Sequence, residues 1–218
     1  EDGVKLFDFS AVCSNPKIPL IVVICFLAFP VAAQDACERP VVVLGDSLSA
    51  GYGIDPGEGW VALLGRQLQT PTVNASVSGE TTAGATATLP RVLAEHQPSV
   101  VVVELGGNDG LRGLPLSESE GNLERIITLS KEHGAAVLLL GMRLPPNYGK
   151  AYTDQFEAIY KRLAQRYELA FVPFFLDGVA LDPDLMQSDG IHPNAVAQPK
   201  MLDNVLGTLT TLLDRVCD

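Results

Sequence analysis

The stretch 40-PVVVLGDSLSAGYG-53 decides the fold, because an apolar run with strand character ends abruptly in Gly-Asp-Ser. The consecutive apolar residues Val41–Leu44 predict a buried β-strand. Gly51 and Gly53 follow closely and indicate a sharp turn. Ser47 therefore stands directly after a buried strand. It is either a nucleophile or the N-cap of a helix, a position that serine often occupies, and the stretch alone does not decide between the two roles.

The length and composition of the chain favour a single domain with a sizeable core. The chain has 218 residues, of which 47% are hydrophobic and 6% aromatic. Abundant Val, Leu, Ala and Gly suit buried parallel strands that are covered by helices. The formal net charge is −11, and no block of Lys or Arg occurs. Neither nucleic acid nor an anionic membrane surface is therefore an expected partner.

Short β-rich runs alternate with amphipathic helical patterns along the chain after Cys37. Apolar residues at helical spacing mark helices within Tyr152–Tyr167 and Leu202–Leu213. This alternation predicts an α/β fold of three layers, in which a five-stranded parallel sheet carries helices on both faces. The predicted strands are Val41–Leu44, Thr72–Val77, Val100–Leu105, Ala136–Leu140 and Ala170–Val172.

One of these helices has recognisable start and stop signals. The segment 117-SESE-120 has the form of a capping box, which predicts that the helix begins there. Gly134 is a good residue to follow the last helical turn, so the helix is expected to end just before it.

Polar groups follow the predicted strands at the points where the strands end. Ser47 follows the first strand, Ser78–Glu80 the second and Gly106–Asp109 the third. A fourth group, 189-DGIHP-193, lies after the fifth strand. Because active groups of open α/β sheets gather at the carboxyl edge, we expect these groups to share one rim.

Elimination among the three histidines singles out His192. His96 lies at a predicted helix end, and His133 lies in a last helical turn, where a cation favours the helix dipole. His192 lies in a loop three residues after Asp189, where one short turn can hold a base and its orienting carboxylate together. Ser47, His192 and Asp189 can therefore form a catalytic set if folding joins the two ends of the chain.

Several other motifs are absent. The nucleophile elbow G-x-S-x-G requires glycine at position 49, where Ser49 stands. Gly51–Gly57 does not fit G-x-G-x-x-G, and no G-x-x-x-x-G-K-[ST] occurs. No Cys or His pairs have zinc spacing.

The N-terminal part, 1–33, is interpreted as a signal peptide with an atypical, acidic leader. Ile18–Ala33 contains no charged residue, and Val31 and Ala33 match a signal-peptidase site. The alternative is a membrane anchor, but the run is shorter than the roughly 20 residues that a span needs. Residues 34–218 would then be one mature domain. Its cysteines, Cys37 and Cys217, either form a disulfide that joins the two ends or remain two separate thiols.

Four blocks in order resemble the SGNH, or GDSL, hydrolases: GDSLSAGYG (45–53), NASVSGETTAG (74–84), LGGNDGLRGLP (105–115) and SDGIHPN (188–194). Together with GMRLPPNYG (141–149), they are similar to one subgroup. It comprises the periplasmic acyl-CoA thioesterase, lysophospholipase and arylesterase enzymes of Gram-negative bacteria. The resemblance extends from about Pro40 to the C-terminus and implies a flavodoxin-like SGNH hydrolase fold.

The resemblance assigns a role to each block residue. Ser47 would be the nucleophile, His192 the general base and then acid, and Asp189 its orienting carboxylate. The oxyanion hole would consist of the backbone N–H groups of Ser47 and Gly79 and the side-chain amide of Asn108. Such an acyl-serine cycle needs no metal and no cofactor.

The expected substrates are small-molecule or lipid acyl compounds, namely acyl-CoA, lysophospholipids and aryl esters. We expect the acyl chain to bind along the Gly107–Pro115 and Met142–Tyr148 loops. The resemblance further implies a periplasmic or secreted protein, which we expect to be a monomer without stable membrane insertion after cleavage. The alternatives are a carbohydrate acetylesterase with the same catalytic set and, in another class, a non-catalytic ligand-binding α/β module. The substrate-binding residues expected in the two loops are Leu111, Leu114, Leu144 and Pro145.

Overall fold

The computed structural model describes residues 38–217. The predicted signal peptide and Cys37 lie outside this range. Within it, no helix is both long enough and apolar enough to cross a lipid bilayer. Cys217, the last described residue, is disulfide-bonded.

Five parallel strands form one sheet in the order β2-β1-β3-β4-β5, which confirms the predicted architecture. The two long central strands pair in register from Val41 with Val100 to Gly45 with Glu104. The strands are β1 (Val41–Gly45), β2 (Thr72–Asn74), β3 (Val100–Glu104), β4 (Ala136–Leu140) and β5 (Ala170–Val172).

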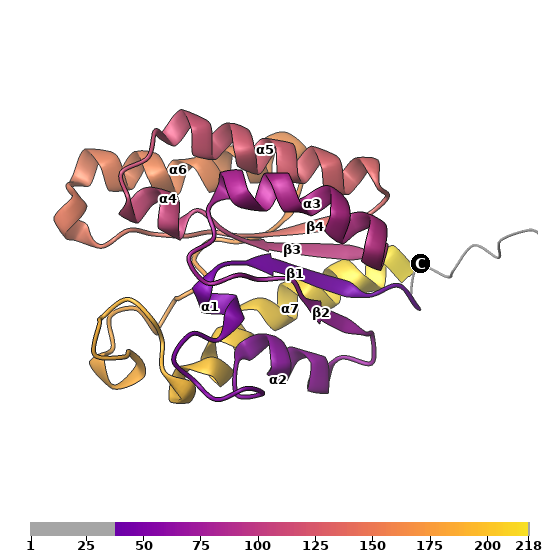
Figure 1. The fold of residues 1–218 in the computed structure, drawn as a ribbon, viewed down its shortest axis with the longest axis horizontal. Helices are drawn as coiled ribbons and strands as arrows, with labels where there is room; N and C mark the ends of the chain where they lie inside the picture. Colours follow the sequence, from indigo (N-terminus) through magenta and orange to yellow (C-terminus); the bar gives the residue numbers. More distant parts are fainter. Residues whose placement is uncertain (1–37, 218) are drawn as a thin grey trace, which may run out of the picture. The chain divides into compact units, whose positions relative to one another are not determined.

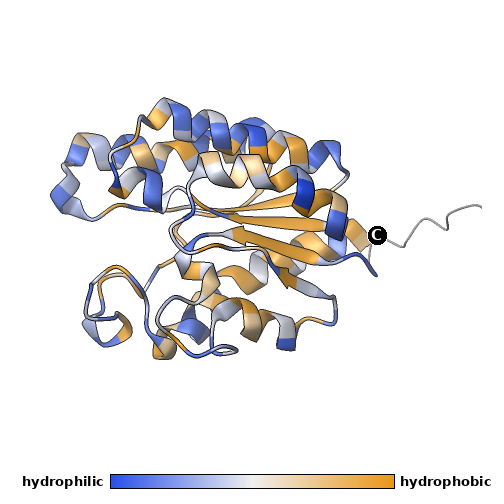
Figure 2. Ribbon diagram, in the orientation of Figure 1, coloured by the Kyte–Doolittle hydropathy of each residue, from blue (hydrophilic) through white to orange (hydrophobic). Residues whose placement is uncertain are grey.

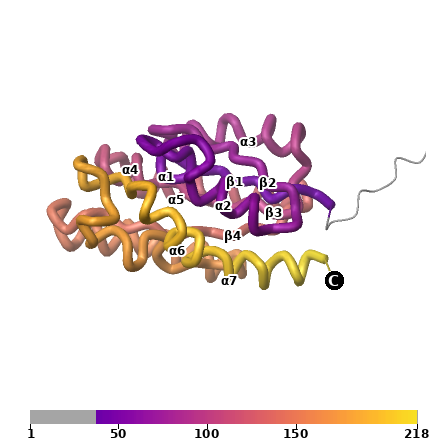
Figure 3. Tube along the Cα trace, turned by 90° about the horizontal axis from the view of Figure 1, so that it is seen from below, coloured from indigo at the N-terminus to yellow at the C-terminus, as the bar shows by residue number. Residues whose placement is uncertain are grey.

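Helices cover both faces of the sheet (Figure 1). One face carries α3 (Thr82–His96), α4 (Gly107–Leu111), α5 (Leu116–Glu132) and α6 (Lys150–Tyr167). The other face carries α2 (Trp60–Gln67) and the long α7 (Gln198–Cys217), which run close together in Figure 3. The short α1 (Ser47–Ala50) follows β1 at once. Three 3₁₀ turns complete the described chain: η2 (Pro146–Tyr148), η3 (Pro183–Leu185) and η4 (Ala195–Ala197).

The central strands are apolar except at Glu104, the last residue of β3, because helices bury both of their faces. Val41–Val43 and Val100–Val103 have no exposed surface. Figure 2 shows the strands as a continuous hydrophobic layer, whereas the helices alternate between hydrophobic and hydrophilic residues. The uninterrupted valine runs in the sequence are thus the direct signature of a sheet enclosed between two helical layers.

Two local predictions differ from the structure. The regular second strand ends at Asn74 and not at Val77. Beyond it, the N–H groups of Ala75 and Val77 still donate to β1 carbonyl groups, while the N–H of Ser76 donates to the Asn74 side chain instead. The capping-box prediction is wrong. Helix α5 begins at Leu116 after Pro115, and Glu120 pairs with Arg162 of α6 instead of capping. The predicted helix end is confirmed, since Gly134 has a positive φ of 74° just beyond α5.

Candidate active site

The loops that carry the candidate residues all lie at the carboxyl edge of the sheet, as predicted. Helices α1 and α4 follow β1 and β3 directly, and Figure 1 shows both at the same end of the sheet. The segment between η3 and η4, which contains Asp189 and His192, contributes the fourth loop. Segments more than 100 residues apart in sequence therefore converge on one rim, and the hydrogen bonds described below confirm it.

Ser47 is the first residue of α1 and not its cap. Asp46 is the N-cap, and its side chain accepts a hydrogen bond from the N–H of Leu48. The N-cap interpretation of Ser47 is therefore wrong, because Asp46 already satisfies the free N–H group of this helix start. The Ser47 hydroxyl is left to face the loop that carries His192, and only 9% of the residue is exposed.

Ser47, His192 and Asp189 form one hydrogen-bonded chain. The Ser47 Oγ lies 2.8 Å from His192 Nε2, although the two residues are 145 positions apart in sequence. His192 Nδ1 lies 2.7 Å from Asp189 Oδ2. Because an ionised carboxylate can only accept, the proton belongs on Nδ1, and Nε2 is free to accept the serine proton.

Asp189 is held in its ionised form by the turn that it occupies. Its Oδ1 accepts the backbone N–H groups of Ile191 and His192 at 2.9 and 3.0 Å. The backbone N–H of His192, followed by its imidazole, lowers the pKa of the Asp189 carboxyl to about 2. The carboxylate and the imidazole are thus oriented by the same short turn, as the spacing Asp189–His192 suggested.

Side-chain amides anchor this turn to the N-terminal half of the domain. Gln187 Nε2 donates to the carbonyl groups of Tyr52 and Pro193, at 2.8 and 3.0 Å. The buried Gln198, at the start of α7, accepts the N–H of Trp60 at 3.0 Å across 138 residues. These bonds hold the histidine loop, residues 187–194, against the nucleophile turn, residues 45–53.

The three expected oxyanion donors are the N–H groups of Ser47 and Gly79 and the side-chain amide of Asn108, which is bonded to the residue before Ser47. Gly79 has a positive φ of 80°, and its carbonyl oxygen accepts a hydrogen bond from the Arg112 guanidinium at 3.0 Å. Within residues 38–217, the N–H groups of Ser47 and Gly79 have no hydrogen-bond partner. Asn108 donates one amide proton to Asp46 Oδ2 at 3.0 Å, which leaves its second proton for a ligand.

Asp109 connects the two loops that carry Gly79 and Asn108, a link that the sequence did not indicate. Its buried carboxylate accepts the N–H of Thr82 at 3.0 Å, and it also accepts the Thr82 hydroxyl. Because Thr82 begins α3 directly after the Gly79 turn, this contact fixes the distance between the two loops.

The expected substrate-binding residues divide into core and surface positions. Leu144 is 8% exposed and belongs to the core, so little of it is available to a ligand. Leu111 is partly buried, whereas Leu114 and Pro145 are exposed. The two loops lie together, because the Tyr148 hydroxyl donates to the Leu111 carbonyl at 3.0 Å.

Sequence reasoning missed three apolar side chains at this rim. Tyr52, Val77 and Ile191 are 52%, 56% and 44% exposed, and each lies within five residues of a candidate catalytic or oxyanion residue. The Tyr52 ring packs against the His192 ring with centroids 4.5 Å apart. Their positions inside the sequence blocks were the only signal that could have indicated them.

The other histidines have the structural roles that were expected. His96 ends α3, and His133 is the C-cap residue of α5, with Nδ1 2.9 Å from the carbonyl of Leu129. Among the described residues, no group of His, Cys, Asp or Glu has the arrangement of a metal site.

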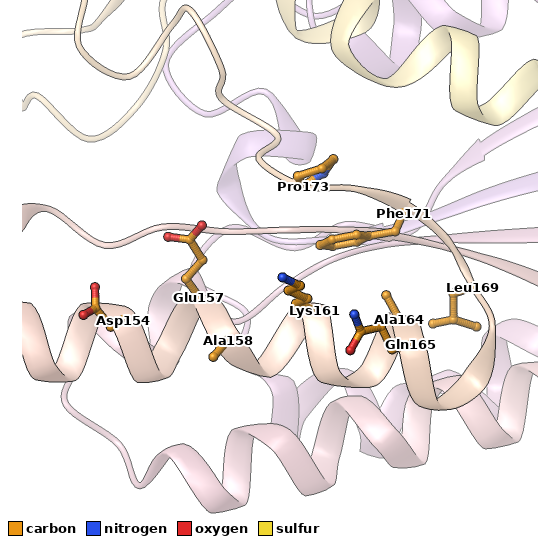
Figure 4. Close-up of a pocket in the computed structure, with 9 residues that line it drawn as sticks. All are labelled: Asp154, Glu157, Ala158, Lys161, Ala164, Gln165, Leu169, Phe171 and Pro173. Carbon is orange, nitrogen blue, oxygen red and sulfur yellow. The ribbon is translucent and has the colours of Figure 1, made fainter.

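A separate groove lies between α6 and the edge strand β5 (Figure 4). Helix α6 contributes Asp154, Glu157 and Lys161, which face Phe171 and Pro173 across the groove. No catalytic or oxyanion candidate lines this groove. We therefore assign it no part in the chemistry of the rim.

A parallel α/β fold with serine, histidine and aspartate in hydrogen-bond contact at the carboxyl edge of its sheet defines a serine hydrolase. The chain belongs to the GDSL-like Lipase/Acylhydrolase family, whose model matches residues 43–198. It is an ester hydrolase of the SGNH type, and the expectation drawn from the four sequence blocks is confirmed.

Comparisons with known proteins agree with this family. Esterase TesA of Pseudomonas aeruginosa is 47% identical over 192 residues, which cover 86% of this chain and 96% of the relative. The thioesterase 1/protease 1/lysophospholipase L1 of Escherichia coli K12 is 45% identical and covers 86% and 89%. An arylesterase of Vibrio mimicus is 43% identical and covers 79% and 89%. A crystal structure of TesA superimposes with a TM-score of 0.78 at 47% identity, over 80% of this chain and 99% of that one.

Proposed function

We propose that this enzyme hydrolyses acyl esters and thioesters through an acyl-serine intermediate, with Ser47 as nucleophile. The observation that carries the proposal is the 2.8 Å contact between Ser47 Oγ and His192 Nε2. A serine hydroxyl is a weak nucleophile until a positioned base accepts its proton, and His192 is such a base, oriented by Asp189.

The proposed cycle has two halves. Ser47 Oγ attacks the acyl carbon while its proton passes to His192 Nε2, and the oxygen of the tetrahedral intermediate accepts the N–H groups of Ser47, Gly79 and Asn108. His192 then protonates the leaving thiol or alcohol. A water molecule gives a proton to His192 and attacks the acyl-serine; the bond to Ser47 Oγ then breaks, His192 returns the proton to Ser47 Oγ and the acid is released.

Apolar surface around the rim supports an acyl substrate. Tyr52, Val77 and Ile191 are exposed beside the catalytic groups, and Leu114 and Tyr148 extend this surface with 36% and 37% exposure. Side chains of this kind gain free energy by covering a hydrocarbon chain. The names of the relatives, which include thioesterase, lysophospholipase and arylesterase, support acyl-CoA, lysophospholipid and aryl ester substrates for this chain.

The carbohydrate acetylesterase alternative shares the same cycle but needs a different rim. Apart from Tyr52 and Tyr148, no large aromatic side chain of the described residues is prominently exposed, so a platform for stacking sugar rings is not evident. We further propose a periplasmic or secreted location without stable membrane insertion, on the basis of the predicted signal peptide at 1–33. That the protein is a monomer stays a prediction.

The test is a hydrolysis panel with acyl-CoA, lysophospholipid, p-nitrophenyl ester and acetylated sugar substrates. Wild type should hydrolyse the first three classes, and Ser47→Ala should lose roughly 10⁴-fold or more in kcat while remaining folded. Equal rates for the two proteins would contradict the nucleophile assignment. A preference for acetylated sugars would favour the acetylesterase alternative.

A second variant tests the acyl site. Leu111→Trp should shift the preferred acyl-chain length toward shorter chains, because a larger side chain would occupy part of the surface along which we expect the acyl chain to lie. The matched control is Leu181→Trp, at a side chain that is 95% exposed and lies outside the four sequence blocks and outside the two loops. An unchanged chain-length profile for Leu111→Trp would contradict the proposed position of the acyl chain.

A further inference from the structure

Glu104, the last residue of β3, lies completely buried beneath the nucleophile turn. Its Oε2 accepts the N–H of Asp46 at 3.2 Å and the hydroxyl of Ser49 at 2.7 Å. Its Oε1 has no hydrogen-bond donor among the described residues, although it is shielded from solvent. A buried carboxylate oxygen without a donor would be costly, so the protonation state of this group requires an explanation.

The Glu104 carboxyl lies against Asp46, because its Oε2 accepts the Asp46 N–H at 3.2 Å, and each carboxyl group shifts the pKa of the other. Two ionised carboxylates can only accept hydrogen bonds, so the two side chains can bond to each other only if one of them is protonated. Two negative charges at such a distance would also repel each other strongly in a buried site. The pair therefore carries one proton in its stable state.

The partners of each carboxyl indicate where that proton resides. Asp46 Oδ1 accepts the N–H of Leu48 at 3.1 Å, and Oδ2 accepts the Asn108 amide at 3.0 Å. Both oxygens of Asp46 are thus stabilised as acceptors, which favours its ionised form. Glu104 Oε1 lacks a donor and is the oxygen that can carry the proton.

Burial raises the pKa values of both carboxyl groups and so also favours a proton on the pair. It raises the pKa of Asp46 to about 6, and it raises the pKa of Glu104 well above its usual range, with a further contribution from the charge of Asp46. Both shifts favour a protonated carboxyl group in the pair, and the hydrogen bonds described above place that proton on Glu104.

The groups that face the pair come from every element packed around it. The charge of His192 in the histidine loop acts on Asp46, and the Tyr160 hydroxyl of α6 lies within electrostatic reach of both carboxyl groups and of Asp109. The Tyr160 hydroxyl donates a hydrogen bond to the Leu105 carbonyl at 2.8 Å. Among the described residues, no Lys or Arg forms an ion pair with either carboxyl group, so nothing but a proton neutralises the second charge.

Gly45 shows how closely the Glu104 carboxyl approaches the nucleophile turn. A Cβ added at Gly45 would lie 2.8 Å from Glu104 Oε2 and 2.8 Å from the Ser49 side chain. The first residue of the Gly-Asp-Ser turn is therefore a glycine because the carboxyl group of β3 occupies the space that a side chain would need.

We propose that Glu104 is a positioning residue whose neutral carboxyl group donates a hydrogen bond to the Asp46 carboxylate, so that the pair fixes both the nucleophile turn and the Asn108 amide. This inference rests on the acyl-serine cycle proposed above. Glu104 touches no substrate atom and acts through Asp46, which precedes Ser47 and binds the oxyanion donor Asn108. Loss of the shared proton at alkaline pH places two charges under the turn and lowers kcat.

The test compares Glu104→Gln with Glu104→Ala in a p-nitrophenyl ester assay across pH 6 to 10. The glutamine amide can donate to Asp46 while its oxygen accepts from Ser49, so it reproduces the neutral acid. We expect Glu104→Gln to keep kcat within about threefold of wild type at pH 7 and to lose less activity than wild type as the pH rises. Glu104→Ala should lose roughly tenfold or more in kcat with little change in KM. The matched control is Glu124→Gln at an exposed ion pair on α5, which should not change the profile.

Two outcomes would overturn the inference. One is a Glu104→Gln variant as impaired as Glu104→Ala, which would mean that Glu104 works as a carboxylate. The other is a Glu104→Ala variant with wild-type kcat. An inactive wild type that is indistinguishable from Ser47→Ala would instead contradict the proposed function. If the variants do not fold, the infrared spectrum of wild type decides, because a neutral Glu104 requires a protonated-carboxyl band at pH 7 and its absence would refute the proposal.

Discussion

Asn108→Ala tests the oxyanion hole most directly, because it removes one donor and leaves the catalytic set intact. Among the described residues, Asn108 makes no hydrogen bond with His192 or Asp189. Its side-chain amide donates a hydrogen bond to Asp46 Oδ2 at 3.0 Å. The Gly79 and Ser47 N–H groups remain in place. The substitution therefore subtracts a single amide from the site.

The expected loss follows from the bonds that disappear. A preorganised donor to the oxyanion contributes about 3 kcal/mol to stabilisation of the transition state, which corresponds to a loss of roughly 10²-fold in kcat. KM should change little, because the negative charge that Asn108 stabilises develops after substrate binding. The lost bond to the buried Asp46 carboxylate should also cost about 1–3 kcal/mol of folding stability, which is a fall of roughly 2–10 °C in Tm for a domain of this size.

The assay is steady-state hydrolysis of a p-nitrophenyl ester at pH 7, together with thermal unfolding followed by circular dichroism. Asn122→Ala is the matched control, because Asn122 also makes one side-chain hydrogen bond, to Thr82 at 3.1 Å, but lies outside the oxyanion hole. It should lose stability without a comparable loss in kcat. If Asn108→Ala retains kcat within about threefold of wild type, Asn108 is not an oxyanion donor and the reasoning is refuted.

Three further predictions concern the orientation of the imidazole, the acid limit of stability and the packing beneath the site. Asp189→Asn should reduce kcat by about 10²–10⁴-fold at pH 7, because an amide no longer fixes the imidazole tautomer. Because the pKa of Asp189 is lowered to about 2 in the folded state, its stabilisation is complete above about pH 4 and is lost as the pH falls toward 2. The difference in urea midpoint between wild type and Asp189→Asn should therefore shrink across that range, and a difference that grows there would contradict the assignment. Gly106→Ala should lower Tm by several degrees, because the residue has a φ of +104° and a Cβ would lie 2.3 Å from the Tyr160 hydroxyl. Gly121→Ala, where a Cβ meets nothing within 4 Å, is its control, and equal Tm values for the two variants would show that this packing argument is wrong.

The sequence by itself determined the layers of the fold and the residues of the site. The runs Val41–Leu44 and Val100–Val103 are short, apolar and rich in β-branched residues, which is typical of strands buried on both faces. Once these strands were located, the polar residues directly after them became the candidates, because parallel strands share a carboxyl edge. Elimination among three histidines then led to His192.

Local signals failed where a distant partner competes for the same group. Ser117–Glu120 has the form of a capping box, yet Glu120 pairs with Arg162 on α6, and Ser119 donates its hydroxyl to Asp109. Ser47 had the sequence context of an N-cap, but Asp46 takes that role. Propensity reflects only neighbours within a few residues, whereas these choices depend on side chains that other elements supply.

Only the tertiary structure decided the protonation and the distances of the site. Ser47 and His192 meet across 145 residues, and no local pattern encodes a separation of 2.8 Å. Glu104 is a single polar residue at the end of an apolar run in the sequence, and in the fold it is a buried acid in contact with Asp46. The physical reason is that a pKa is set by burial and by charges from neighbouring strands, which come together only when the chain has folded.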